Sequence, residues 1–162
     1  MDEFEKYLNQ SLRFLSFRPR SEKEVIEKLR EKKAPQEVID RIVIQLKDHK
    51  FLNDADFAGW FIDQRLRFKP KSLGIIKLEL KQKGIAPDTI EQVISNLSEE
   101  TENDSPKNDL ESAKKLVEKR LIRYKGLNRQ EIYQKLGGYL ARRGFNWDTI
   151  KKSIDDGLED RL

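Results

Sequence analysis

The 162-residue chain contains no cysteine and a single histidine, His49. Without cysteine it can form no disulfide framework, thiolate nucleophile or Cys-ligated zinc site, and one histidine excludes a multi-histidine metal site. Long hydrophobic runs are also missing, because no apolar stretch approaches the ~20 residues that span a bilayer, and the first twenty residues lack the apolar core of a signal peptide. We therefore expect a soluble, cytoplasmic protein of a reducing compartment that carries no metal or cofactor.

Motifs that carry catalytic chemistry are absent as well. The chain has no Gly-rich phosphate loop, HExxH pair, EF-hand or nucleophile elbow. Gly137-Gly138 lies inside a helical pattern, without a preceding strand or a following Lys-Ser, and indicates close helix packing. Carboxylates are abundant, but no pair stands out as flanking a pocket. We expect that the protein is not an enzyme.

What the sequence does contain is apolar residues at helical spacing along almost its whole length. One clear case is the set Val38, Ile39, Ile42, Val43 and Leu46. No segment alternates apolar and polar residues long enough to predict a strand. Ser21 with Glu24, and Asn128 with Glu131, have the spacing of capping boxes. Nine helices are predicted, at residues 2–17, 21–32, 35–48, 54–67, 72–83, 87–97, 109–124, 128–143 and 146–157.

The chain also repeats itself. A shift of 51 residues places Phe17–Ser21 on Phe68–Ser72, and a further shift of 60 places Gly84 on Gly144. The matched positions include proline, glycine and basic residues as well as apolar ones, so a chance match among amphipathic helices is the weaker explanation. Three-helix units this small bury little apolar surface alone, and neighbouring repeats are expected to stack.

The predicted fold class is therefore all-α, with three tandem three-helix repeats of helix-turn-helix-like form stacked into an elongated or curved array. Its parts are expected at residues 1–52 (first repeat), 53–97 (second repeat), 98–112 (an acidic linker and helix start) and 113–157 (third repeat).

Charge is concentrated in the third repeat. Residues 113–154 hold 12 basic and 3 acidic residues, a net charge of +9, whereas residues 98–112 carry −5. Lys115, Lys119 and Arg123 are four residues apart and would form one stripe, and the excess positive charge of this segment is expected to be without acidic partners at i,i+4. Lys125, Arg129, Arg142 and Arg143 extend it. Such a stripe is typical of a surface for a polyanion or an acidic protein groove, and the alternative is an ordinary solvated helix face.

A second basic cluster precedes the middle helix of the first two repeats. It comprises Arg18, Arg20, Arg65, Arg67, Lys69 and Lys71. Phe17 and Phe68 are interleaved with these cations. Aromatic residues placed in this way can stack on bases, but at helix ends they are more often core residues, and burial is therefore expected for both.

Several ordered motifs are similar to those of the RecX family, bacterial regulators of the RecA recombinase. They are Leu12–Leu15 with Arg18–Ser21, Phe51–Ala58, Leu78–Ile85, Lys135-Leu136, Tyr139-Leu140 and Arg142–Phe145. The similarity runs from about residue 8 to 155. Lys33 and Lys50 stand where the family commonly has glycine, and the acidic linker is longer than in many members.

The resemblance implies a non-enzymatic protein that binds the groove of the RecA–single-stranded DNA filament and modulates, usually as an inhibitor, its assembly, ATP hydrolysis and strand exchange. A linear array of this kind has no need to self-associate, so a monomer is expected. We assign the main contact to the third-repeat stripe and a second contact to residues 65–71. Two alternatives remain open: a helical module that binds DNA directly, and a general scaffold for protein partners.

Overall fold

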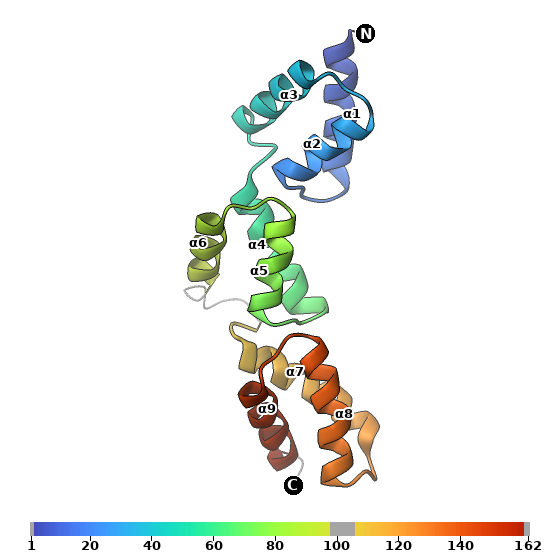
Figure 1. Cartoon of the computed structure of the whole chain (residues 1–162), viewed down its shortest axis with the longest axis vertical. Helices are drawn as coiled ribbons and strands as arrows, with labels where there is room; N and C mark the ends of the chain where they lie inside the picture. The colour runs from blue at the N-terminus through green and yellow to red at the C-terminus, as the bar shows by residue number, and fades with distance from the viewer. Residues whose placement is uncertain (1, 98–105, 161–162) are drawn as a thin grey trace. The chain divides into compact units, whose positions relative to one another are not determined.

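A computed structural model describes residues 2–97 and 106–160 of the chain. Within these ranges the chain forms α-helices, one short 3₁₀ helix and no strand (Figure 1). The elements are α1 (Glu3–Phe17), α2 (Glu22–Glu31), α3 (Gln36–Asp48), α4 (Asp54–Phe68), α5 (Leu73–Gln82), α6 (Pro87–Leu97), α7 (Asp109–Leu121), the 3₁₀ helix η1 (Ile122–Tyr124), α8 (Arg129–Arg142) and α9 (Trp147–Asp160). We refer to α1–α3, α4–α6 and α7–α9 as the first, second and third groups.

The nine predicted helices are present in the described ranges; most of their ends agree with the prediction or differ by one residue, and two ends differ by three. The predicted helix over 109–124 gives way to a 3₁₀ turn at Ile122, so its last residues leave the α-helical register. The last helix continues to Asp160, past the predicted end at residue 157. Gly157 lies inside this helix. A Cβ atom at this position would lie 2.6 Å from Val117 Cγ1 on α7, so there is no room for a side chain. Close packing of α7 on α9 therefore requires this glycine.

The expectation for Gly137-Gly138 is wrong. A Cβ atom at Gly137 would meet nothing within 4 Å, and one at Gly138 would meet only Arg142 Nη1, at 3.3 Å. Neither glycine mediates close packing of helices. The helical pattern alone gave no means of telling this pair from Gly157.

Helix starts follow the side-chain capping that the sequence predicts. Ser21 accepts a hydrogen bond from the Glu24 amide, and Asn128 accepts one from the Glu131 amide, at 3.1 and 2.9 Å. In a complete capping box the Glu24 carboxylate would bond back to the Ser21 amide, but here it pairs with Arg18. Gly84 and Gly144 end helices with positive φ angles of 83° and 91°, where glycine avoids the steric cost of the left-handed region.

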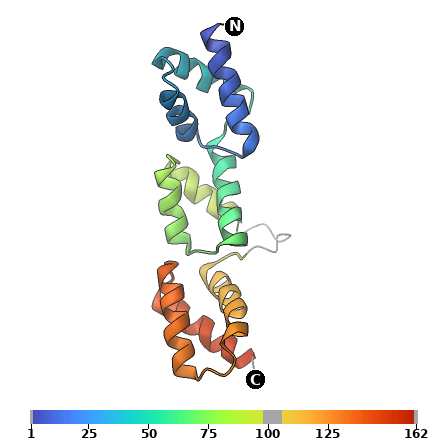
Figure 2. The same ribbon diagram turned by 90° about the vertical axis from the view of Figure 1, so that its right-hand side faces the viewer.

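The helices are held by apolar cores that follow the predicted stripes. In the first group the core includes Val25, Leu29, Ile39, Ile42 and Leu46; in the third group it includes Ala113, Val117, Leu136, Leu140 and Ile154. The turned view in Figure 2 shows α7, α8 and α9 as one bundle of helices. By contacts, the chain divides into two compact parts, Met1–Phe61 with Glu79–Asn96 and Ile62–Leu78 with Leu97–Leu162, so the division runs through the second group.

Consecutive groups are joined by the same device in both parts. Asp54, the first residue of α4, accepts a hydrogen bond from the backbone amide of Glu22, the first residue of α2, at 2.8 Å. Asp109, the first residue of α7, accepts one from the amide of Leu73, the first residue of α5, also at 2.8 Å. The first amides of a helix lack intrahelical partners, and a carboxylate is favourable there. Each of these helix starts is therefore satisfied by a side chain of the following group.

Candidate functional site: a cationic surface on the third group

The candidate site is built on α7, the turn after it and the end of α8. Lys115 and Lys119 lie one helical turn apart on α7, whose opposite side carries the buried residues Ala113 and Val117. Arg123 lies in the 3₁₀ turn rather than on the helix, and Lys125 follows it. The spacing of four that predicts one straight stripe is therefore broken after Lys119.

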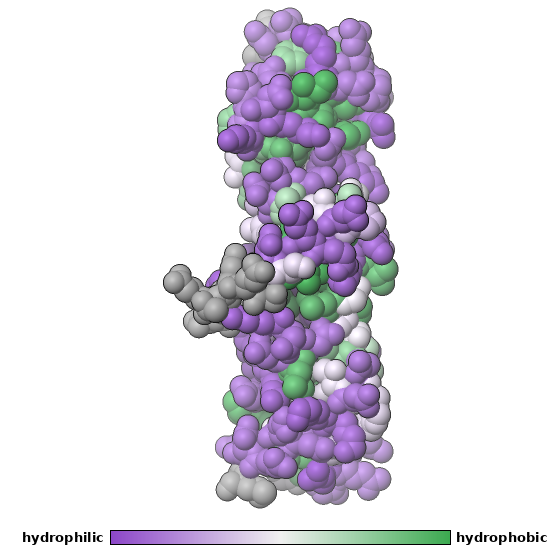
Figure 3. Space-filling view, turned by 90° about the vertical axis from the view of Figure 1, so that its left-hand side faces the viewer, coloured by the Kyte–Doolittle hydropathy of each residue, from purple (hydrophilic) through white to green (hydrophobic). Residues whose placement is uncertain are grey.

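Five cations of this region have no ion pair or hydrogen-bond partner for their side chains within residues 2–97 and 106–160. They are Lys115, Lys119, Arg123, Lys125 and Arg142. Lys115 is partly exposed and the others are exposed. We call these five residues the cationic surface. Figure 3 shows hydrophilic side chains over most of one side of the third group.

Other cations of the third group have acidic partners, and Lys151–Asp155 and Lys152–Asp156 are pairs at i,i+4, which corrects the expectation that such partners are absent. The α9 carboxylate of Asp155 pairs with Arg129 at 3.0 Å and Lys151 at 3.2 Å. Asp156 pairs with Lys114 at 3.0 Å, and the hydrogen bond from Lys114 is the main reason that the pKa of Asp156 is lowered. The net charge of +9 was counted over residues 113–154, a segment that ends just before Asp155 and Asp156. The net charge of the folded third group is therefore lower than +9.

Arg129 and Arg142 lie at opposite ends of α8, about 20 Å apart along the helix. Arg129 is held by Asp155. Arg143 has a structural role, since its Nη1 donates to the Pro70 carbonyl at 3.2 Å and its own carbonyl accepts from the Ser72 amide at 3.0 Å. It connects the third group to the chain just before α5.

Arg18 and Arg20, which the sequence predicts as contact residues, are held inside the first part of the chain. Arg18 pairs with Glu24 at 2.6 Å and lies over the ring of Trp60, 5.6 Å from its centroid. Arg20 donates to the Phe14 carbonyl and stacks on the Phe14 ring at 3.8 Å. Burial, and then the charge of Arg18, lower the pKa of Arg20. These contacts leave little of either guanidinium for a partner.

Glu24 was assigned from the sequence only to a capping box, and its ion pairs at this position were missed. Its side chain is only 10% exposed and lies near three cations: Arg18, Arg20 at 3.8 Å and Lys83 at 3.9 Å. The i,i+4 spacing of Arg20 and Glu24 is a signal that the sequence offered. The approach of Lys83, from the second group, has no local signature.

In the second basic cluster, Arg67 pairs with Asp63 at 2.8 Å, Arg65 and Lys71 also have interaction partners, and Lys69 is exposed. The two interleaved aromatics are not core residues: Phe17 is 73% exposed and Phe68 70% exposed. The expectation of burial for this pair is wrong, because each lies at the last residue of its helix, beyond the apolar stripe.

No group of three or more metal-ligating side chains occurs in the described part of the chain. Among the same residues, no helix is both long and apolar enough to cross a bilayer.

Family models cover most of the chain. The model of the first three-helix domain of RecX matches residues 8–46, that of the second matches residues 53–94, and that of the third matches residues 108–154. The chain belongs to the RecX family. The resemblance drawn from the motifs is confirmed, and so is the prediction of an all-α fold of three tandem three-helix repeats.

Relatives and solved structures agree with this assignment. A protein of Bacillus subtilis named regulatory protein RecX is 36% identical over 95% of the chain, and one of Clostridium perfringens is 34% identical over 94%. The chain spans 56% of the first relative and 69% of the second. A crystal structure of RecX from Lactobacillus salivarius superposes with a TM-score of 0.75 at 27% identity, covering 99% of both chains. A second, of regulatory protein RecX, gives 0.74 at 27% identity, over 95% of this chain and 74% of the other. The RecX family is one of regulatory proteins.

Proposed function

We propose that this member of the RecX family binds the RecA–single-stranded DNA filament in the cytoplasm and inhibits its assembly, ATP hydrolysis and strand exchange. It acts as a monomer and without catalysis of its own. Family membership supports the choice of target. The five unpaired cations of the third group are the observation that carries the proposal for this chain, because a filament offers DNA phosphates and acidic protein side chains along its length.

The cationic surface is assigned the main contact. Lys115, Lys119 and Arg123 meet the filament first, with Lys125 and Arg142 beside them. Arg129 and Arg143 contribute mainly through the contacts that hold the third group, and Arg18 and Arg20 do the same in the first. Arg65, Arg67, Lys69 and Lys71 form the second contact. Two weak contacts on one chain add as linked binding events, so the pair binds more tightly than either alone.

The test is charge reversal with a matched control. The variant Lys115→Glu/Lys119→Glu/Arg123→Glu changes the net charge by the same amount as Lys50→Glu/Lys81→Glu/Lys107→Glu, whose three lysines are exposed and lie outside the proposed contacts. We expect the first variant to lose binding to RecA-coated fluorescent single-stranded DNA and to lose inhibition of the filament ATPase. The control should keep both, and both variants should keep their helical circular dichroism. Equal loss of binding in the two variants would mean that net charge alone, and not the cationic surface, determines binding.

The direct DNA-binding alternative rests on the same cations, and one comparison separates the two. Binding is measured on bare and on RecA-coated single-stranded DNA at physiological salt. Strong preference for the coated DNA supports the filament proposal, whereas equal affinity supports the alternative. A general protein scaffold would show no dependence on DNA at all. In either DNA-dependent case, affinity should fall as salt rises.

A further inference from the structure

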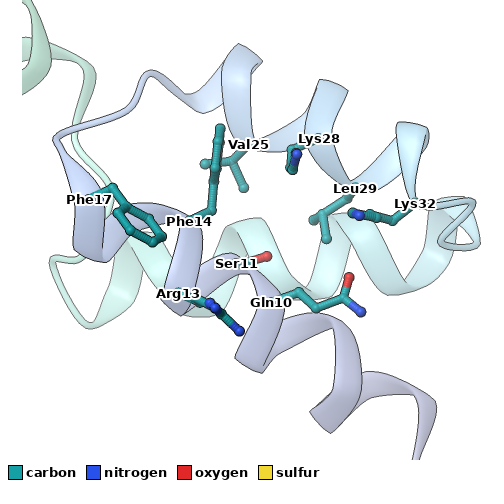
Figure 4. Close-up of a pocket in the computed structure, with 9 residues that line it drawn as sticks. All are labelled: Gln10, Ser11, Arg13, Phe14, Phe17, Val25, Lys28, Leu29 and Lys32. Carbon is teal, nitrogen blue, oxygen red and sulfur yellow. The ribbon is translucent and has the colours of Figure 1, made fainter.

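A pocket of about 350 Å³ lies between α1 and α2, within the first group. Its apolar wall consists of Phe14, Phe17, Val25 and Leu29 (Figure 4). The side chains of α1 line one side and those of α2 the other, so the pocket is open along the gap between the two helices. It is separate from the cationic surface of the third group and uses none of its residues.

The rim of the pocket is positively charged. Arg13, Lys28 and Lys32 line it, and no Asp or Glu does. Lys28 has a distant partner in Glu31, at 4.0 Å. Within the described ranges, the side-chain charges of Arg13 and Lys32 have no acidic partner. Three cations around an apolar hollow favour an occupant that carries negative charge.

The inner surface adds a polar requirement. Gln10 Oε1 is buried and accepts no hydrogen bond from the described residues. A buried acceptor without a donor is unfavourable, and in folded proteins such an atom usually has a partner. Gln10 lines the pocket beside Ser11, so an occupant with an N–H group can supply the missing donor. A peptide backbone has such a group, and a phosphate has none.

We infer that this pocket binds an acidic peptide segment of a partner protein, which inserts one apolar side chain between Phe14 and Leu29. Its carboxylates lie at Arg13, Lys28 and Lys32, and a backbone amide donates to Gln10 Oε1. This is a second protein-binding surface that goes beyond the proposed function of the third group.

A peptide fits the pocket better than a nucleic acid does. Phe14 already has the Arg20 guanidinium 3.8 Å and the Lys28 ammonium 5.5 Å from its ring centroid, so a base that stacked on this ring would compete with two cations. Most of the wall is aliphatic or aromatic, and apolar anchors of a partner protein bind in such hollows.

The chain offers a matched pair of substitutions for the test. Phe17 and Phe68 end the first helix of consecutive groups and are 73% and 70% exposed, yet Phe68 lies outside this pocket. The probe is a short fluorescein-labelled peptide rich in Glu with one central Phe, titrated with the full-length chain and followed by fluorescence anisotropy. We expect Phe17→Ala, and separately Arg13→Glu/Lys32→Glu, to weaken binding about tenfold or more, and Phe68→Ala to leave it unchanged.

Two further readouts distinguish the pocket from general charge attraction. The Gln10 side-chain amide resonances of ¹⁵N-labelled protein should shift on peptide addition, and a peptide with Ala in place of Phe should bind more weakly. Failure of the Phe peptide to bind, or equal loss in Phe17→Ala and Phe68→Ala, overturns the inference. So does an oligothymidine that competes with the peptide and itself loses affinity in Phe17→Ala. None of these measurements contains RecA, so they are independent of the filament test.

Discussion

Two lysines, Lys33 and Lys50, adopt left-handed backbone conformations, with φ angles of 66° and 62°. Each follows a helix end, after α2 and after α3, where a glycine has the lowest steric cost. A residue with a Cβ atom is strained by about 1 kcal/mol or more in this region. The resemblance of motifs predicted glycine at the same two positions.

We therefore predict that Lys33→Gly and Lys50→Gly each raise the free energy of unfolding by about 1 kcal/mol. Urea unfolding followed by circular dichroism measures the change. Lys32→Gly serves as a control, since Lys32 has a negative φ of −81° and should lose stability on the same substitution. A loss of stability in all three variants would mean that the strain at Lys33 and Lys50 is offset by other contacts.

At the scale of elements, the starts of α2 and α5 depend on carboxylates from the next group. Asp54 is half-buried where it caps α2, and burial is the main cause that raises its pKa, partly opposed by its hydrogen bond from the Glu22 amide. Because the folded protein binds a proton at Asp54 more tightly than the unfolded chain does, this group's contribution to stability is lost as the pH rises from about 3.8 through the raised pKa.

Substitutions at Asp54 separate its hydrogen bond from its charge. Asp54→Ala removes the acceptor and should lower the free energy of unfolding by about 1 kcal/mol. Asp54→Asn keeps an acceptor oxygen and has no charge to bury, so its stability relative to the native chain should increase as the pH rises through that window. Unfolding curves at a series of pH values test both. The account of Asp54 fails if the Asn and Ala variants behave alike at every pH.

For the molecule as a whole, the contact between the second and third groups depends on a glycine. Gly144 has a φ of 91°, and a Cβ atom there would overlap the Ile75 side chain and lie 2.6 Å from Ser72 Oγ. Arg143 beside it bonds to Pro70 and Ser72. Gly84 makes the corresponding contact with Lys23 in the first part of the chain, where an added Cβ would lie 2.7 Å from the Lys23 Cβ.

Gly144→Ala should therefore lower the free energy of unfolding by more than the strain of its left-handed backbone alone would. Gly126 is the control, because it has a similar φ of 88° and open space around the position of an added Cβ. We predict that Gly126→Ala lowers the free energy of unfolding by about 1 kcal/mol and that Gly144→Ala lowers it by about 2 kcal/mol or more. Thermal and urea unfolding provide the comparison. Equal losses would mean that Ile75 moves aside without cost.

The sequence predicted features that depend on local spacing. Helices, their caps at Ser21 and Asn128, and the glycine ends at Gly84 and Gly144 all follow from residues within a few positions of one another. The Gly157 contact, by contrast, depends on where α9 meets α7, which periodicity does not reveal. The two phenylalanines were misjudged because hydrophobicity suggests burial, while their positions at helix ends leave them exposed.

The candidate site was predictable to a similar extent. The concentration of cations on residues 113–154 is visible in the sequence, and Lys115 and Lys119 share a side of α7 as expected. Which cations keep their charge free of a partner was not predictable, because the pairing of Lys114 and Arg129 with Asp156 and Asp155 depends on the packing of separate helices. The pocket between α1 and α2 likewise arises from tertiary packing.

The carboxylates that cap α2 and α5 have a consequence for shortened forms of the protein. A fragment that ends before Asp109 would lose the acceptor for the Leu73 amide together with the third group, and its α5 would begin with an unsatisfied donor. Such a fragment would be weakened at its new end even if every residue of the second group were kept. Assays on separately expressed repeats would then measure local unfolding as well as lost binding.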